Sequence, residues 1–146
     1  LAAGLLWMAY AAVGLLAWRL SGDAPLIWCA ALAGGCAGFL WFNGHPARVF
    51  LGDVGALGLG SGLGAAALLS HQALALLLIG GVFVAEAGSV IIQVFCFKRW
   101  GVRPFRVAPL HHHIQLGGVA ETHVVMRLWI VGGLLAAAGV ALFWYA

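Results

Sequence analysis

The sequence predicts an all-α polytopic integral membrane protein with five transmembrane helices, and three observations support this fold class. Hydrophobic residues make up 64% of the 146 residues, against about 45–50% in soluble proteins. Charged residues make up only 8%, against a usual share of about 25%, and the mean hydropathy is +1.08. Long apolar runs recur along the chain without the ten-residue alternation of a membrane β-barrel. Seven basic residues against four acidic ones make no nucleic-acid-binding patch.

Five apolar stretches meet the requirement of about 17–25 residues for a helix that crosses a bilayer. In chain order, the first stretch has no charge and the second follows a short polar turn. The third is short, the fourth is long and carries one acidic residue, and the fifth is the last part of the chain. The predicted spans, which together form a single transmembrane domain, are 1–18, 24–42, 54–70, 73–97 and 128–146. Glycines with small-xxx-small spacing predict close helix packing at three pairs: Gly34 and Gly38, Gly58 and Gly62, and Gly60 and Gly64.

The positive charges predict the orientation of these spans. Six of the seven Lys and Arg residues fall in the two long polar segments, 43–53 and 98–127, which lie on one side if the helices alternate. The positive-inside rule makes that side cytoplasmic. Leu1 would then face the cytoplasm and the last residue the outside. Because the chain opens in the middle of an apolar run and without Met, we expect it to be a truncated chain.

The first cytoplasmic segment places an acid just before a predicted helix. Pro46 stops the preceding helix, and Gly52 and Gly55 free the backbone on either side of Asp53. Asp is a favoured N-cap residue, so Asp53 is interpreted either as a cap or as a ligand of a hard metal. Mg²⁺ typically takes one or two carboxylates together with substrate phosphates and water. The two roles are compatible.

The second cytoplasmic segment combines a basic cluster with a run of histidines. The cluster holds four cations that would set the topology or bind anionic lipid head groups: Lys98, Arg99, Arg103 and Arg106. In an extended loop, His111 and His113 would project to one side and His112 to the other. That arrangement disfavours a three-His zinc site. Hydrogen bonding to phosphate or sugar, or proton transfer, suits these three side chains better.

One stripe of the fourth predicted span is polar. Ser89 and Gln93 follow Glu86 at three and seven residues, which places the three side chains on one face of a helix. Glu86 is interpreted either as a protonated residue bonded to its neighbours inside the helix bundle, which we favour, or as part of a groove wall that faces the active site. Gln93 lies nearer the cytoplasmic end and is a candidate for substrate binding.

Several of these features together resemble a known family. The resemblance is carried by the stretch from Asn43 to Gly55 with its Phe-x-Gly-Asp, the run Ala108-Pro-Leu-His-His-His113, residues 124–130, and the spacing of Glu86, Ser89 and Gln93. These stretches are similar to the phospho-N-acetylmuramoyl-pentapeptide transferase (MraY) family of polyprenyl-phosphate glycosyl-1-phosphate transferases. The family has ten transmembrane helices, and this chain resembles its C-terminal half. An adjacent acidic pair of the family lies in the other half, so we expect this chain alone to be inactive.

The resemblance implies an enzyme of peptidoglycan synthesis in the bacterial inner (cytoplasmic) membrane. Such an enzyme transfers phospho-MurNAc-pentapeptide from UDP-MurNAc-pentapeptide to undecaprenyl phosphate, gives lipid I and UMP, and requires Mg²⁺. By the same resemblance, Asp53 is the metal-binding and catalytic carboxylate, and His111, His112 and His113 form a catalytic or substrate-contacting loop. The substrate-binding residues implied are Asn43, Phe50, Gln93 and Ala108. We also expect contact with membrane lipids, and association of two copies as a homodimer is a further possibility for this family.

Two alternatives stay open at this point. A polyprenyl-phosphate GlcNAc-1-phosphate transferase would share the Asp53 loop, although its histidine motif usually lacks the unbroken Pro-Leu-His-His-His. A non-enzymatic membrane module for metal binding or transport would use the histidine run as ligands. Transport requires ligands along a path through the membrane, and only Glu86 lies in such a position.

Overall fold

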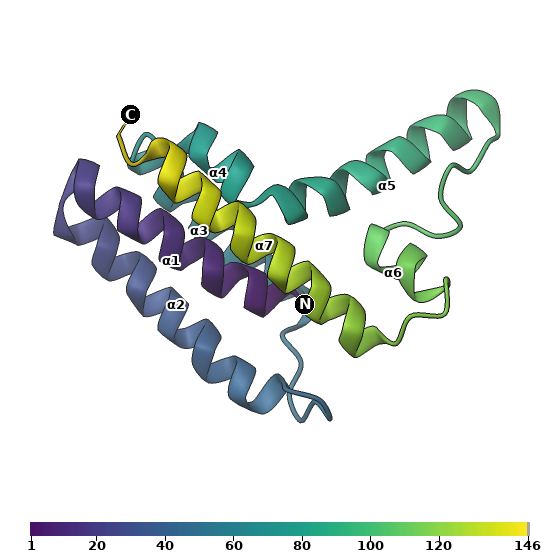
Figure 1. Ribbon diagram of the computed structural model, residues 1–146, viewed down its shortest axis with the longest axis horizontal. Helices are drawn as coiled ribbons and strands as arrows, with labels where there is room; N and C mark the ends of the chain where they lie inside the picture. The colour runs from purple at the N-terminus through teal and green to yellow at the C-terminus, as the bar shows by residue number, and fades with distance from the viewer. Residues whose placement is uncertain (146) are drawn as a thin grey trace.

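The computed structural model describes residues 1–145, and that part of the chain is helical without strands, which confirms the fold class (Figure 1). Its helices are, in chain order, α1 (Ala2–Ser21), α2 (Asp23–Asn43), α3 (Gly52–Leu69), α4 (Ala73–Ile79), α5 (Gly81–Trp100), α6 (Leu110–Gln115) and α7 (Glu121–Phe143). Five of them, namely α1, α2, α3, α5 and α7, are long and apolar enough to cross a membrane. The number of spans therefore agrees with the prediction.

Helix α1 lies at the centre of the bundle, between α2 and α7 in Figure 1. Its side chains supply most of the core, and Tyr10, Val13 and Leu16 are almost fully buried. The Tyr10 hydroxyl donates a hydrogen bond to the carbonyl oxygen of Leu59 on α3, at 2.6 Å. This bond satisfies a polar group that would otherwise be costly to bury, and it holds α3 against α1.

Glycines allow close helix packing, but mostly not at the predicted pairs. A Cβ atom at Gly139 would lie 2.5 Å from Ile79 Cγ1, and one at Gly132 would lie 2.4 Å from Leu5 Cδ2. These glycines let α7 approach α4 and α1. At Gly34, in contrast, a Cβ would meet nothing within 4 Å, and the same is true of Gly38, Gly58, Gly60 and Gly64. Of the six glycines in the predicted pairs, only Gly62 is packed, against Tyr10, so the packing prediction is wrong for the other five within residues 1–145.

The predicted span 73–97 is wrong as a single helix, because the structure interrupts it at Gly80. Helix α4 ends at Ile79 and α5 begins at Gly81. Two adjacent glycines have low helix propensity and contribute no side chain to hold the two halves in line. Helix α4 stays in the bundle against α7, whereas α5 extends away from it (Figure 1).

The segment 98–127 contains more helix than predicted. It includes α6, and α7 begins at Glu121, seven residues before the predicted start of the last span at residue 128. Glu121 lies in the first turn of α7, where a negative charge complements the helix dipole. The apolar run marks only the part of α7 that would lie in lipid, so it missed this polar first turn.

The helix ends alternate between two ends of the bundle. At one end the Arg19 guanidinium lies 5.5 Å from the Trp144 ring centroid, which joins the last turn of α1 to the end of α7. At the other end Trp129 Nε1 donates to the Leu1 carbonyl oxygen at 3.0 Å, close to the loop between α2 and α3 (Figure 1). The side of the membrane on which each end lies stays a prediction.

Candidate functional site

The loop between α2 and α3 folds back on the end of α2. Asn43 Nδ2 donates to the Val49 carbonyl oxygen at 2.6 Å, and the Arg48 N–H donates to the Phe42 carbonyl oxygen at 3.1 Å. Phe50, which follows this turn, is 80% exposed. Of the predicted substrate-binding residues here, Asn43 therefore shapes the loop, while the Phe50 ring is free to stack on a planar ligand.

Asp53 is the second residue of α3, and its carboxylate is exposed. The N-cap interpretation is wrong, because Leu51 occupies the cap position and α3 has no side-chain cap bond. Within residues 1–145 the structure records no hydrogen bond or ion pair for this carboxylate. An acid in the first turn is stabilised by the helix dipole and keeps its oxygens available to a ligand.

Asp53 also lines a large, mainly apolar cavity. The cavity has a volume of about 660 Å³ and is lined by residues of α1, α3, α4 and α5, among them Leu6, Leu57, Leu77 and Phe83. A carboxylate beside an apolar cavity can hold the polar end of an amphipathic ligand, or its metal, while the apolar part lies against the helices.

The histidine run forms the short helix α6, so the prediction of an extended loop is wrong. Consecutive side chains on a helix point about 100° apart, and each histidine accordingly meets a different partner. His112 Nδ1 lies 2.9 Å from Gln115 Oε1, and the Arg106 N–H donates to His113 Nδ1 at 3.2 Å. The His111 and His112 rings lie 4.2 Å apart between centroids.

Gln93 connects α5 to the segment that precedes α6. Its Nε2 donates to the Phe105 carbonyl oxygen, and the Phe105 N–H donates to its Oε1, both at 3.0 Å. The Phe105 ring packs edge-on against His113, with 5.7 Å between centroids. Gln93 therefore lies in one cluster with the histidines, and its amide is engaged by backbone groups of Phe105. Ala108 lies on the short segment between Phe105 and α6, and the substrate-binding roles of both residues stay predictions.

Glu86 is the residue of this cluster whose partner the sequence did not reveal. Its Oε2 lies 2.9 Å from His111 Nδ1, and the His111 backbone N–H donates to Oε1 at 3.2 Å and to Oε2 at 3.4 Å. Glu86 is therefore bonded to a neighbour within the protein, and that neighbour lies on α6, among the residues of the predicted site. Its position on the same stripe as Gln93 was the one signal that could have connected it to the site.

The two halves of the predicted site come from separate parts of the fold. Asn43, Phe50 and Asp53 lie on the α2–α3 connection, and the histidine cluster lies where α6 packs on α5 and α7. Among residues 1–145, no three His, Cys, Asp or Glu side chains converge on a point that could hold a metal. A metal at Asp53 would therefore need ligands from substrate and water, as Mg²⁺ commonly has.

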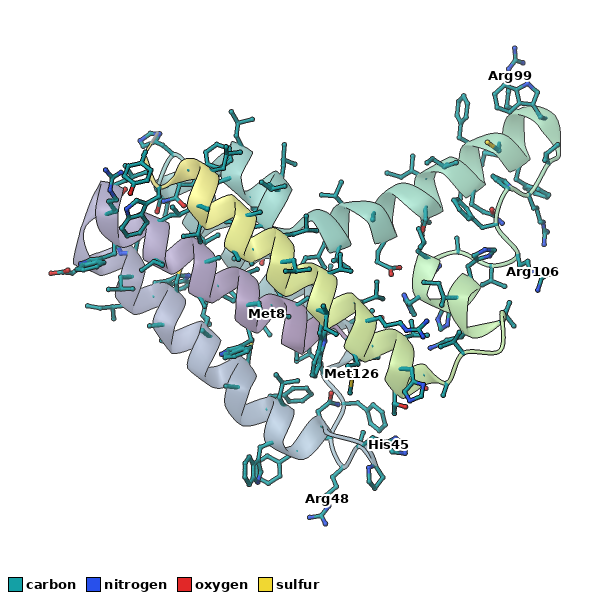
Figure 2. All side chains as sticks on the ribbon, viewed as in Figure 1. Met8, His45, Arg48, Arg99, Arg106 and Met126 are labelled. Carbon is teal, nitrogen blue, oxygen red and sulfur yellow. The ribbon has the colours of Figure 1, made fainter. Side chains whose placement is uncertain are left out.

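Basic side chains lie on the chain segments that carry or flank the two parts of the site. Figure 2 shows Arg99 at the far end of α5, Arg106 on the segment after it, and Arg48 with His45 on the α2–α3 connection. The arginines are exposed, and the Arg103 guanidinium lies 4.8 Å from the Phe97 ring. Exposed cations at both places favour anionic ligands.

Known proteins resemble this chain strongly over most of its length. Residues 1–71 match the family described as Glycosyl transferase family 4. The chain is similar to three proteins named phospho-N-acetylmuramoyl-pentapeptide-transferase. The one from Dichelobacter nodosus is 55% identical over 79% of this chain and 32% of that protein. The one from Pelotomaculum thermopropionicum is 56% identical over 75% and 34%, and the one from Desulforudis audaxviator is 50% identical over 97% and 42%. The chain thus spans about a third to two fifths of the length of these curated relatives.

Proposed function

We propose that this chain, whose residues 1–71 match glycosyl transferase family 4, is the part of a phospho-N-acetylmuramoyl-pentapeptide transferase that carries Asp53 and the histidine cluster. The enzyme would transfer phospho-MurNAc-pentapeptide from UDP-MurNAc-pentapeptide to undecaprenyl phosphate and release UMP. The observation that carries the proposal is the exposed Asp53 carboxylate in the first turn of α3, for which the structure records no partner within residues 1–145. Identities of 50–56% to relatives of that name support it.

The site residues fit a magnesium ion bound through substrate. Asp53 would hold the ion with one carboxylate, and the phosphates and water would complete the coordination. Bound Mg²⁺ would neutralise the pyrophosphate and stabilise the charge that develops on departing UMP. The basic residues near both parts of the site would draw the two anionic substrates together.

The remaining predicted residues have roles that suit their surroundings. The exposed Phe50 ring would stack on uracil, and Asn43 would present the loop on which Phe50 lies. Gln93 and Ala108 would line the nucleotide and sugar site, where Gln93 holds the segment before α6 through Phe105 and Ala108 lies on that segment. His111, His112 and His113 would contact phosphate or hydroxyl groups through ring nitrogens that their protein partners leave free.

The proposal also places the protein in the bacterial inner membrane, with the Asp53 loop and α6 on the cytoplasmic side, where nucleotide sugars are found. The distribution of Lys and Arg supports this orientation. Membrane lipids and undecaprenyl phosphate would approach from the bilayer, and assembly as a homodimer is part of the same proposal.

A chimera tests the proposed function. This chain would replace the matching segment of the Desulforudis audaxviator relative, which is 50% identical over 141 residues. UMP release would then be measured with UDP-MurNAc-pentapeptide, undecaprenyl phosphate and Mg²⁺. We expect release with this donor and none with UDP-GlcNAc, which the alternative GlcNAc-1-phosphate transferase would use.

The decisive variant is Asp53→Asn, because it keeps the shape of the side chain and removes the charge that a Mg²⁺ site needs. We expect turnover to fall by at least about 10²-fold, the scale typical of losing one preorganised electrostatic contact. Asp23→Asn is the matched control, since Asp23 is the first-turn acid of α2 at the other end of the bundle. Equal loss in both variants, or wild-type turnover and Mg²⁺ dependence in Asp53→Asn, would contradict the proposal.

A further inference from the structure

The contact between Glu86 and His111 joins two residues that are 25 positions apart in the sequence and lie on different helices. The Glu86 side chain is 15% exposed and that of His111 is 26% exposed, so the contact is largely shielded from solvent. Both the ring and the backbone N–H of His111 form hydrogen bonds with the same carboxylate, that of Glu86. The backbone N–H and the Nδ1 atom of His111 therefore together fix the position and the rotation of the imidazole ring.

This geometry determines which ring nitrogen carries the proton. With Glu86 ionised, its oxygens only accept hydrogen bonds, so His111 Nδ1 donates to Glu86 Oε2. In the neutral ring the proton then lies on Nδ1, and Nε2 keeps its lone pair. The structure records no partner for His111 Nε2 within residues 1–145, and the ring is partly exposed.

The neighbouring His113 has the opposite arrangement. Its Nδ1 accepts the Arg106 backbone N–H at 3.2 Å, which leaves the proton of the neutral ring on Nε2. His111 and His113, two positions apart on α6, thus present different groups, because each is held at Nδ1 by a different kind of partner. His111 offers an acceptor, and His113 offers a donor.

We propose that Glu86 is a positioning residue that holds His111 as the Nδ1–H tautomer and directs its basic Nε2 toward a proton-bearing group of the substrate. This inference rests on the proposed function for the nature of that group, which would be a hydroxyl of a phosphate or a sugar. Glu86 itself does not touch the substrate. Its effect passes through His111, in the way that a carboxylate fixes a histidine tautomer in many sites.

The direct test is the tautomer of His111, measured by nitrogen NMR on this 146-residue chain with ¹⁵N-labelled histidine in lipid bilayers. Signals of His111 are assigned by their loss in His111→Asn. We expect a protonated Nδ1 and an unprotonated Nε2 in the wild type. In Glu86→Gln the charge is lost and both tautomers should appear, and Glu86→Asp should restore part of the wild-type pattern.

His113 reports whether α6 has kept its place. If Glu86 positions His111 alone, the Nε2–H signal of His113 stays unchanged in Glu86→Gln. A wild-type His111 with its proton on Nε2 would overturn the proposal. So would a His111 tautomer that does not respond to Glu86→Gln, or a simultaneous change at His113, which would make Glu86 a structural anchor of α6.

Activity gives a second readout, in the chimera described above. Glu86→Gln should lower kcat by about 10²-fold or more, the usual range for a positioned acid–base group, and leave KM for the nucleotide sugar unchanged. A raised KM with unchanged kcat would overturn the proposal. If the unsubstituted chimera shows no transfer, the proposed function fails, and the NMR measurement still decides the role of Glu86.

Discussion

Removing the Gln93 amide should loosen the segment before α6 by an amount that its hydrogen bonds define. In Gln93→Leu, a side chain of similar size leaves both the Phe105 N–H and its carbonyl oxygen without their partner. Each such bond contributes about 0.5–1.5 kcal/mol net, so the local opening free energy should fall by about 1–3 kcal/mol. At about 1.4 kcal/mol for each factor of ten, the Phe105 amide should exchange roughly 5- to 150-fold faster.

Hydrogen–deuterium exchange followed by mass spectrometry measures this directly on peptides that cover residues 101–109. Gln93→Glu is the matched variant, because it keeps an acceptor for the Phe105 N–H and loses the donor, so its exchange should be intermediate. Peptides from the centre of α1 serve as an internal reference and should not change. If peptide 101–109 exchanges at the wild-type rate in Gln93→Leu, the two bonds do not hold the segment and the reasoning fails.

Three further outcomes are expected. With a single cysteine in a cysteine-free background, an impermeant maleimide added to intact cells should label the exposed position 19 and not position 103, and the reverse would invalidate the orientation. Gly139→Val should lower the free energy of unfolding by about 1–3 kcal/mol, because the new side chain clashes with Ile79. Gly34→Val meets open space and should lower it by less than about 1 kcal/mol. Chemical denaturation in detergent compares the two variants. The purified chain alone should release no UMP from UDP-MurNAc-pentapeptide, and release above background would contradict that expectation.

Features of the fold that depend on local sequence were predictable, and features that depend on contacts between distant residues were not. Hydropathy alone located five spans, because lipid imposes the same requirement on every crossing helix. It missed the interruption at Gly80, since a glycine inside an apolar run costs only about 1 kcal/mol and packing of the neighbours decides the outcome. It also missed α6, a helix of six residues between prolines and glycines, because helices this short depend on tertiary contacts.

The same distinction applies to the candidate site. Asp53 at the start of a helix was predictable from Gly52 and the apolar run after it. The pairing of Glu86 with His111 was not, because it joins residues 25 positions apart through the packing of α6 on α5. The sequence placed Glu86 and Gln93 on one face, and only the structure shows which backbone and ring groups meet that face.

The interruption at Gly80 also has a consequence for cooperativity. Helix α4 is held in the bundle by its contact with α7, whereas only Val82 and Ser89 of α5 are buried. Segments with few buried contacts open at lower free energy than the core around them. We expect α5 to melt as a unit of its own, below the transition of the bundle. A variant can therefore keep the melting temperature of the bundle and still have lost the arrangement of Glu86 and Gln93.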